Sequence, residues 1–183
     1  MTSATLFPCD TGSSAVMGDA LDTGDERYRL WLERRLAAVD ESPCVLACCL
    51  LNPSTADAER NDNTVTKMMA LGRRWGFGRL IVVNMFGWRA TDPRELLAAH
   101  LAGWPIIGPT DQYIRQAANE SDLFVVGWGR LHPKLRWRES WVLGLLRGRL
   151  VHCLGRNQDE SPRHPLYLPA TTVPQLFVDE RCR

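Results

Sequence analysis

The sequence lacks the features that mark several specialised classes of protein. Its apolar runs are all far shorter than the roughly 20 residues that a transmembrane helix needs. The first residues show no basic segment followed by an apolar one, so we expect no secretory signal and a cytoplasmic location. Gly-x-Gly-x-x-Gly and Gly-x-x-x-x-Gly-Lys loops are absent, which disfavours the ordinary nucleotide-binding loops. Ser-His-Asp and Gly-x-Ser-x-Gly arrangements are absent as well, which disfavours a serine hydrolase.

The cysteines also follow no metal-binding pattern. Six are present, but no two form a Cys-x-x-Cys pair and no histidine stands at zinc-ligand spacing from them. Cys44, Cys48 and Cys49 share one apolar run, where thiols act as small buried hydrophobic groups. We therefore expect no metal and no other cofactor.

Length and composition predict one globular domain. The chain has 183 residues, 45% of them hydrophobic and 23% charged, which is ordinary for a soluble protein. Residues 1–26 contain five acidic residues and no Lys or Arg, and we interpret them as a flexible or accessory N-terminal segment. Residues 27–183 form the predicted α/β domain.

Positive charge gathers in one segment although the net charge is only +1. Between Arg130 and Arg156 there are seven Lys or Arg residues and a single acid, Glu139. Such a segment can bind the phosphates of a nucleotide or nucleic acid. A solvated helix face is the alternative.

Strand and helix patterns alternate along the domain. Continuous apolar runs predict buried strands at 44–51, 80–84, 123–129 and 150–154. Helices are predicted at 65–75, 94–100, 111–118 and 139–147, and residues 33–39 also look helical after a short strand or helix start at 28–32. The fold class is therefore α/β, as a three-layer αβα sandwich around a mostly parallel four-stranded sheet.

Ligands of such sheets bind beyond the carboxyl ends of the strands, so we examine the segments that follow them. The first strand leads into Asn52-Pro53-Ser54-Thr55-Ala56-Asp57, where Pro53 stiffens the corner from which Asn52 projects. Ser54 and Thr55 offer hydroxyl and backbone N–H groups to a phosphate. The alternative is an Asn-Pro turn with Ser/Thr capping.

Polar and aromatic residues also follow the second strand. The amide of Asn84 has a donor and an acceptor, as reading a base edge requires. Phe86 or Trp88 would supply a stacking surface. Alternatively, Asn84 caps the strand and both aromatic side chains fill the core.

The third and fourth strands lead to the remaining candidates. Trp128-Gly129 ends the third strand, where glycine permits a sharp turn or close approach of a ligand. His164 stands between prolines in a loop that we expect over the strand ends, and His132 competes with it for a catalytic role.

Taken together, Leu51-Asn52-Pro53-Ser54-Thr55-Ala56-Asp57, Asn84 with Arg89-Ala90-Thr91-Asp92-Pro93, Trp128-Gly129 and His164-Pro165-Leu166-Tyr167 resemble a bacterial and phage family of unknown function. The resemblance covers roughly residues 28–168. That family in turn resembles a remote branch of the uracil-DNA glycosylase superfamily, which implies the same fold. There, an Asp or Asn before Pro positions water, an Asn ending a strand reads the base, and a late His-Pro loop supplies the catalytic histidine. Ser54-Thr55 and the absence of Ser after Pro165 depart from that pattern, so a DNA-wedging loop is not implied.

The resemblance implies cleavage of an N-glycosidic bond in a modified nucleotide or nucleic acid. Asn52 would orient water, Asp57 or Asp62 would supply a base, and His164 would donate a hydrogen bond to the departing base. The predicted catalytic residues are Asn52, His164 and Asp57. The predicted ligand-binding residues are Pro53, Ser54, Thr55, Asn84, Phe86, Arg89, Trp128, Gly129 and Pro165. The alternatives are a non-catalytic binder of a nucleotide or modified base, a hydrolase of free nucleotides, and a structural or partner-binding protein.

Overall fold

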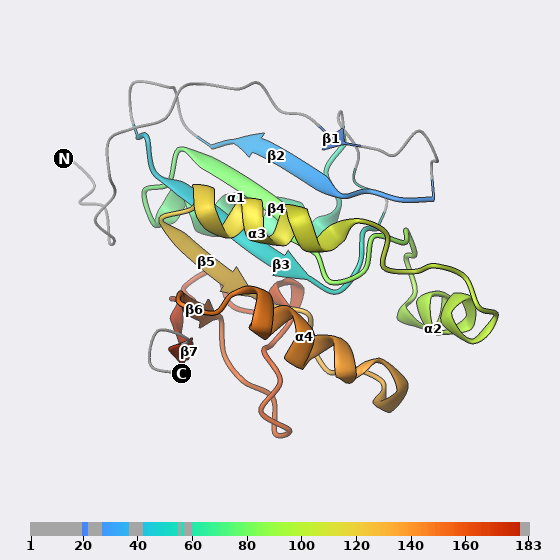
Figure 1. Ribbon diagram of the computed structural model, residues 1–183. Coiled ribbons are helices and arrows are strands. Elements are labelled where there is room, and N and C mark those ends of the chain that lie inside the picture. Colours follow the sequence, from blue (N-terminus) through green and yellow to red (C-terminus); the bar gives the residue numbers. More distant parts are fainter. Residues whose placement is uncertain (1–19, 22–26, 37–41, 55, 57–59, 180–183) are drawn as a thin grey trace.

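A mixed sheet runs through the middle of the protein in the computed structural model, which describes residues 20–21, 27–36, 42–54, 56 and 60–179 (Figure 1). Within that part of the chain the sheet has seven strands in the order β1-β2-β4-β3-β5-β6-β7. Most of the predicted N-terminal segment 1–26 lies outside the described residues, apart from the two residues of β1 (Ala20–Leu21).

The four central strands are parallel, and they are the four that the apolar runs predict. They are β4 (Arg79–Asn84), β3 (Val45–Leu50), β5 (Leu123–Val126) and β6 (Leu150–Cys153). Every residue of β3 and β5 is buried, as expected for strands that helices cover on both faces. Their carboxyl ends therefore meet at one edge of the sheet.

The sheet is wider than the predicted four strands because antiparallel strands extend both sides. β2 (Trp31–Arg35) pairs with β4, and β7 (Gln175–Asp179) pairs with β6. The helix predicted at 33–39 is wrong over its first residues, which belong to β2, while 37–39 lie outside the described residues. Two charged side chains of β2 are buried because each has a polar partner. Glu33 pairs with Arg79 at 3.4 Å, and Arg34 Nε donates to Asn61 Oδ1 at 2.7 Å.

All four remaining predicted helices form. They are α1 (Asn63–Arg74), α2 (Pro93–Leu101), α3 (Thr110–Glu120) and α4 (Trp137–Leu145). Asp62 caps α1 by accepting from the N–H of Val65, and Asp92 caps α2 by accepting from that of Arg94. Two short 3₁₀ helices, η1 (Pro133–Leu135) and η2 (Pro165–Tyr167), follow His132 and His164.

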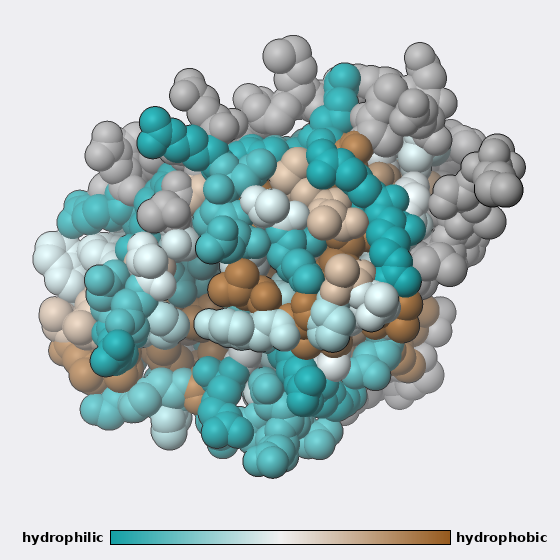
Figure 2. All heavy atoms as spheres, turned by 180° about the vertical axis from the view of Figure 1, so that it is seen from behind, coloured by the Kyte–Doolittle hydropathy of each residue, from teal (hydrophilic) through white to brown (hydrophobic). Residues whose placement is uncertain are grey.

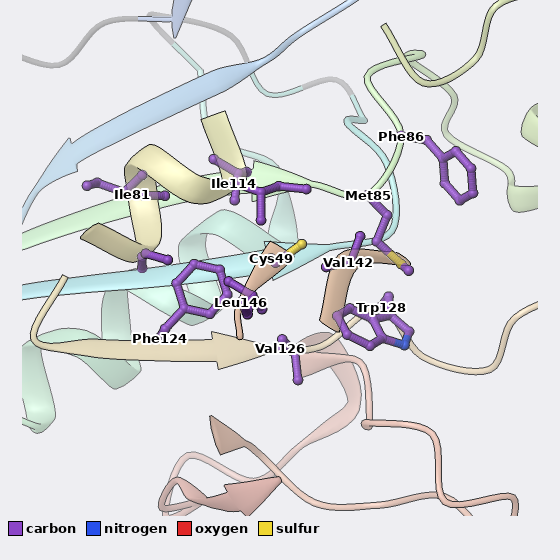
Figure 3. Close-up of a cluster of buried hydrophobic side chains, with 14 of the residues drawn as sticks. Cys49, Ile81, Met85, Phe86, Ile114, Phe124, Val126, Trp128, Val142 and Leu146 are labelled. Carbon is purple, nitrogen blue, oxygen red and sulfur yellow. The ribbon is translucent and has the colours of Figure 1, made fainter. Parts of the chain in front are cut away.

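Helices cover both faces of the sheet and enclose two cores. On one face, Cys48 and Val82 pack with Met68 and Leu71 of α1. The other face carries Cys49, Ile81, Ile114, Phe124 and Val142 among others, from the sheet, α3 and α4 (Figure 3). From behind, the protein surface over α1 is mainly hydrophilic, with small hydrophobic areas between (Figure 2). Within the described residues, no helix is long and apolar enough to cross a membrane.

Candidate functional site

A cleft of about 610 Å³ opens at the carboxyl edge of the parallel strands. Its walls come from the end of β3, the amino end of α1, the end of β5 and the loop that follows β6. Asn52, Ser54, Trp128 and His164, four of the predicted site residues, line this cleft together. A volume of this size lies within the range of about 300–1,000 Å³ that is usual for small-molecule sites.

Asn52 lines the cleft and its side-chain nitrogen is already engaged. Its Nδ2 donates to the carbonyl of Pro53 at 2.9 Å and to that of Ala90 at 2.7 Å. The N–H of Ala90 in turn donates to the carbonyl of Pro53 at 2.9 Å. These bonds join the loops after β3 and β4, and they leave Asn52 Oδ1 as an acceptor that no described residue uses.

His164 presents its other ring nitrogen, Nε2, as a donor. Its Nδ1 accepts from the N–H of Leu166 at 3.4 Å as the chain enters η2. Burial lowers the pKa of His164, and the nearby Asp62 carboxylate opposes that shift. The imidazole is therefore neutral at pH 7, and the hydrogen bond to Nδ1 assigns the remaining proton to Nε2.

Glycines at the end of β5 allow the His164 loop to come this close. A Cβ on Gly127 would lie 3.0 Å from Cδ of Pro165, and one on Gly129 would lie 3.5 Å from Cβ of His164. Gly129 also has a φ of +77°, which a side chain would strain. The N–H of Gly129 donates to the carbonyl of Pro162 at 3.0 Å. Gly129 and Pro165 thus position His164.

Asn84 lies beneath the cleft with its amide unpaired. It is 1% exposed, and neither Nδ2 nor Oδ1 has a hydrogen-bond partner among the described residues. Its side chain points to the α1 face, because Leu80 and Val82 of the same strand pack on that face and side chains alternate along a strand. Asn84 is paired in register with Leu50, which lines the cleft, although Asn84 itself is not part of the lining.

Other predicted site residues lie elsewhere. Phe86 is fully buried in the core on the α3 side, so it offers the cleft no stacking surface (Figure 3). Arg89 donates to the carbonyl of Ala56 at 3.2 Å and to that of Tyr28 at 3.4 Å, and so holds the loop after β3 from outside. Pro53 is a buried member of the same loop. Thr55 and Asp57 lie outside the described residues.

Three further charged residues line the cleft. Arg29 and Arg130 bring positive charge, and Asp62 brings a carboxylate whose Oδ1 accepts from Val65 N–H at 2.8 Å. The sequence already indicates Asp62 as a possible base and Arg130 as part of the basic segment. No comparable signal marks Arg29, which precedes β2 and reaches the cleft only through the antiparallel pairing of β2 with β4.

The basic segment from Arg130 to Arg156 is dispersed. Of its Lys and Arg residues, all of them described, only Arg130 lines the cleft, and it pairs with Asp159 at 3.0 Å. Arg138 is buried against Asp111, and Arg156 pairs with Glu160 at 3.2 Å. Arg147 and Arg149 line a separate hollow of about 460 Å³ with Arg115.

His132 does not share the site. Its Nδ1 accepts from the N–H of Lys134 at 3.3 Å, as that of His164 does from Leu166, yet it is exposed and does not line the cleft. Within the described part of the chain, no three or more His, Cys, Asp or Glu side chains cluster as a metal would require.

One protein family has a profile that matches residues 27–166, and its description is "Protein of unknown function (DUF1643)". The match spans the cleft-forming segments from Arg29 to His164. No curated protein and no solved structure matched the chain in the corresponding comparisons.

Proposed function

Since the chain belongs to the DUF1643 family, whose function is unknown, we propose from its cleft that it hydrolyses an N-glycosidic bond in a nucleotide or nucleic acid. The observation that carries this proposal is that Asn52 and His164 line one cleft, and that the buried amide of Asn84, which has no described partner, stands in register with Leu50 of its lining. The order of the four motifs also resembles that of uracil-DNA glycosylases, and the proposal includes a remote relationship with that superfamily.

Asn84 is the base-reading group in this proposal. A buried amide without partners costs about 1–3 kcal/mol, and a ligand that supplies both a donor and an acceptor removes that cost. The edge of a nucleobase offers this pairing of groups. Because Asn84 is 1% exposed, Leu50 has to move aside, or the base has to enter deeply, for the two edges to meet.

In the proposed reaction, water attacks the sugar while the base departs. The C–N bond breaks with its electron pair going to the base, and the water oxygen bonds to the anomeric carbon. Asn52 Oδ1 accepts one hydrogen bond from that water, and Asp62, the carboxylate of the described cleft lining, takes its proton. His164 Nε2–H donates a hydrogen bond to the base as negative charge develops on it.

An exposed aromatic ring at the rim supports recognition of a base. Tyr167 is 83% exposed and lines the cleft, with its ring centroid 6.2 Å from that of His164. Stacking of a base on an aromatic side chain contributes about 1–3 kcal/mol in single-strand binders. Tyr167 thus takes the stacking role that the sequence had suggested for Phe86.

A second candidate is a binding module that recognises the base without cutting the bond. The observation in its favour is that Asn52 is an amide, which accepts a hydrogen bond but no proton. Asp62, the remaining candidate for that proton in the described lining, is already engaged as the cap of α1.

The test measures release of free base from mononucleotides and from single- and double-stranded DNA with unmodified, deaminated and hypermodified bases. We expect release with at least one substrate, and a loss of about 10²–10⁴-fold in His164→Ala. His132→Ala is the matched control, because it removes the same local hydrogen bond outside the cleft. Saturable binding without release would favour the binding module. Neither binding nor release would contradict both candidates.

A further inference from the structure

Arg29 is a buried cation with an unused hydrogen-bonding edge. It is 2% exposed and lines the cleft. Its Nη1 donates to the carbonyl of Ala56 at 2.6 Å, whereas Nε is buried without a partner. No described residue accepts a hydrogen bond from Nη2 either. Nε and Nη2 form one side of the guanidinium plane, the side that binds two oxygens of an anion in parallel.

The guanidinium lies near the face of the sheet to which Asn84 points. It acts electrostatically on the thiol of Cys48, which points to the α1 face of the sheet. Asn84 points to that face from the adjoining strand β4, so two buried polar groups without a described partner lie on the α1 side of the sheet. Buried polar groups in folded proteins are almost always paired, and both of these groups are explained by a polar ligand.

Arg29 stays protonated at neutral pH although it is buried. Burial lowers its pKa to about 10, Asp62 opposes the shift, and Arg89 and Arg34 add to it. A pKa near 10 keeps the guanidinium charged at neutral pH. Asp62 does not hydrogen-bond to Arg29, and one of its oxygens is engaged with Val65.

We infer that Arg29 is the receptor for an anionic group on the ligand, one that presents two oxygens side-on to Nε and Nη2. This inference deepens the proposed function, on which it rests for the nature of the ligand. Two parts of a nucleotide supply such a group: a terminal phosphate, or a carboxylate carried by a modified base. An internal phosphodiester is disfavoured, because the chain would have to enter and leave a recess in which Arg29 is almost completely buried.

The Nε–H resonance of Arg29 in the ¹⁵N NMR spectrum of the intact protein reports directly on this edge, and its absence from the spectrum of Arg29→Gln assigns it. Inorganic phosphate and acetate are the minimal probes. A nucleoside, its 5′-monophosphate and a nucleoside with a carboxyl group on the base are the larger ones. We expect saturable shifts of the resonance with one of two pairs of probes. Shifts with phosphate and the monophosphate identify a terminal phosphate as the anion. Shifts with acetate and the carboxylated nucleoside identify a carboxylate on the base.

Affinity in the variants gives the second measurement. Arg29→Gln should weaken binding of the anionic nucleoside about 10- to 100-fold, the range for a charge-assisted hydrogen bond, and leave the neutral nucleoside unaffected. Arg29→Lys keeps the charge but not the paired donors, so an intermediate loss is expected. Arg94→Gln is the control, since Arg94 is 90% exposed and pairs with Asp92 outside the cleft.

The outcomes separate this inference from the proposed function. An assigned Arg29 resonance that no anion shifts overturns the inference. Equal affinity for anionic and neutral nucleosides also overturns it, while base recognition by Asn84 would stand. Anion binding at Arg29 without base release from any substrate would support the inference and contradict the hydrolytic function.

Discussion

Replacing Asn84 with leucine should stabilise the protein while abolishing recognition of the ligand. Leucine branches at Cγ as asparagine does, so it fills a similar outline without polar atoms. In the structure this exchange breaks no hydrogen bond, because neither Nδ2 nor Oδ1 of Asn84 has a partner. A polar group kept at a cost to stability is expected where function requires it.

The size of the effect follows from burial. Asn84 is 1% exposed, so its amide is desolvated in the folded state and hydrated in the unfolded state. An unpaired amide in this position costs about 1–3 kcal/mol by mutational measurements. Crowding by the larger methyl groups of leucine offsets part of the gain. We therefore expect the free energy of unfolding to rise by about 0.5–2 kcal/mol, the part of the amide cost of 1–3 kcal/mol that remains after crowding.

Urea unfolding followed by circular dichroism measures this change, and the matched control is Thr110→Val. Thr110 is also 1% exposed, but its hydroxyl donates to the carbonyl of Met85 at 3.3 Å and accepts from Arg138 at 2.9 Å. An apolar residue there breaks both hydrogen bonds, one of them with the charged Arg138, so the control should lose about 1–3 kcal/mol. The two substitutions, both from polar to apolar in the core, should have opposite signs.

A loss of more than about 2 kcal/mol in Asn84→Leu would refute the reasoning, because a loss that large is typical of breaking a satisfied buried group. Unchanged ligand affinity in a folded Asn84→Leu would refute the assigned role even if stability rises.

Three further predictions concern His164 and its surroundings. Gly127→Ala should cost about 1–3 kcal/mol by overpacking and displace His164, because its Cβ would lie 3.0 Å from Pro165; Gly144→Ala, with open space around it, should be neutral or stabilising in the same unfolding assay. Because burial lowers the pKa of His164, the unfolded state binds the proton first as pH falls below about 6.5, so stability should decrease there and level off below the folded-state pKa. Asp62→Asn keeps a helix cap but removes the carboxylate, and should lower the pKa of His164 further in an NMR titration; a rise would contradict the assigned electrostatics.

The central sheet was predictable because its signal is local. Strands covered on both faces need apolar residues at every position, and β3, β4 and β5 show this as continuous runs. The sequence pattern does not indicate β2 as a strand, because two of its five residues are buried charged side chains, Glu33 and Arg34. Arg79 and Asn61, far along the chain, pair with Glu33 and Arg34, and no local pattern contains those partners.

The part of the candidate site that follows the parallel strands could also be predicted from the sequence. Asn52, Trp128 and His164 follow parallel strands, and the meeting of strand ends at one edge brings them into one cleft. Phe86 also follows a strand, but its side chain turns to the opposite face and fills the core. Which face a residue takes after a strand has ended depends on the loop, so this alternative stayed open in the sequence. Arg29 depends on the antiparallel pairing of β2 with β4 and could not be predicted.

The backbone around His164 bears on the proposed chemistry. The N–H of Leu166 points at Nδ1, so a proton on Nδ1 would set two donors against each other and cost that hydrogen bond. Burial acts in the same direction on the pKa of His164. The ring is therefore suited to donate a hydrogen bond from Nε2 rather than to deliver a proton, and in the proposed reaction the base departs as an anion. Arg29 and Arg130 add positive charge to the lining against the single carboxylate of Asp62 within the described residues. Donors and charges held in place by the fold need no reorganisation as that anion forms, which is the condition under which electrostatic stabilisation contributes most to catalysis.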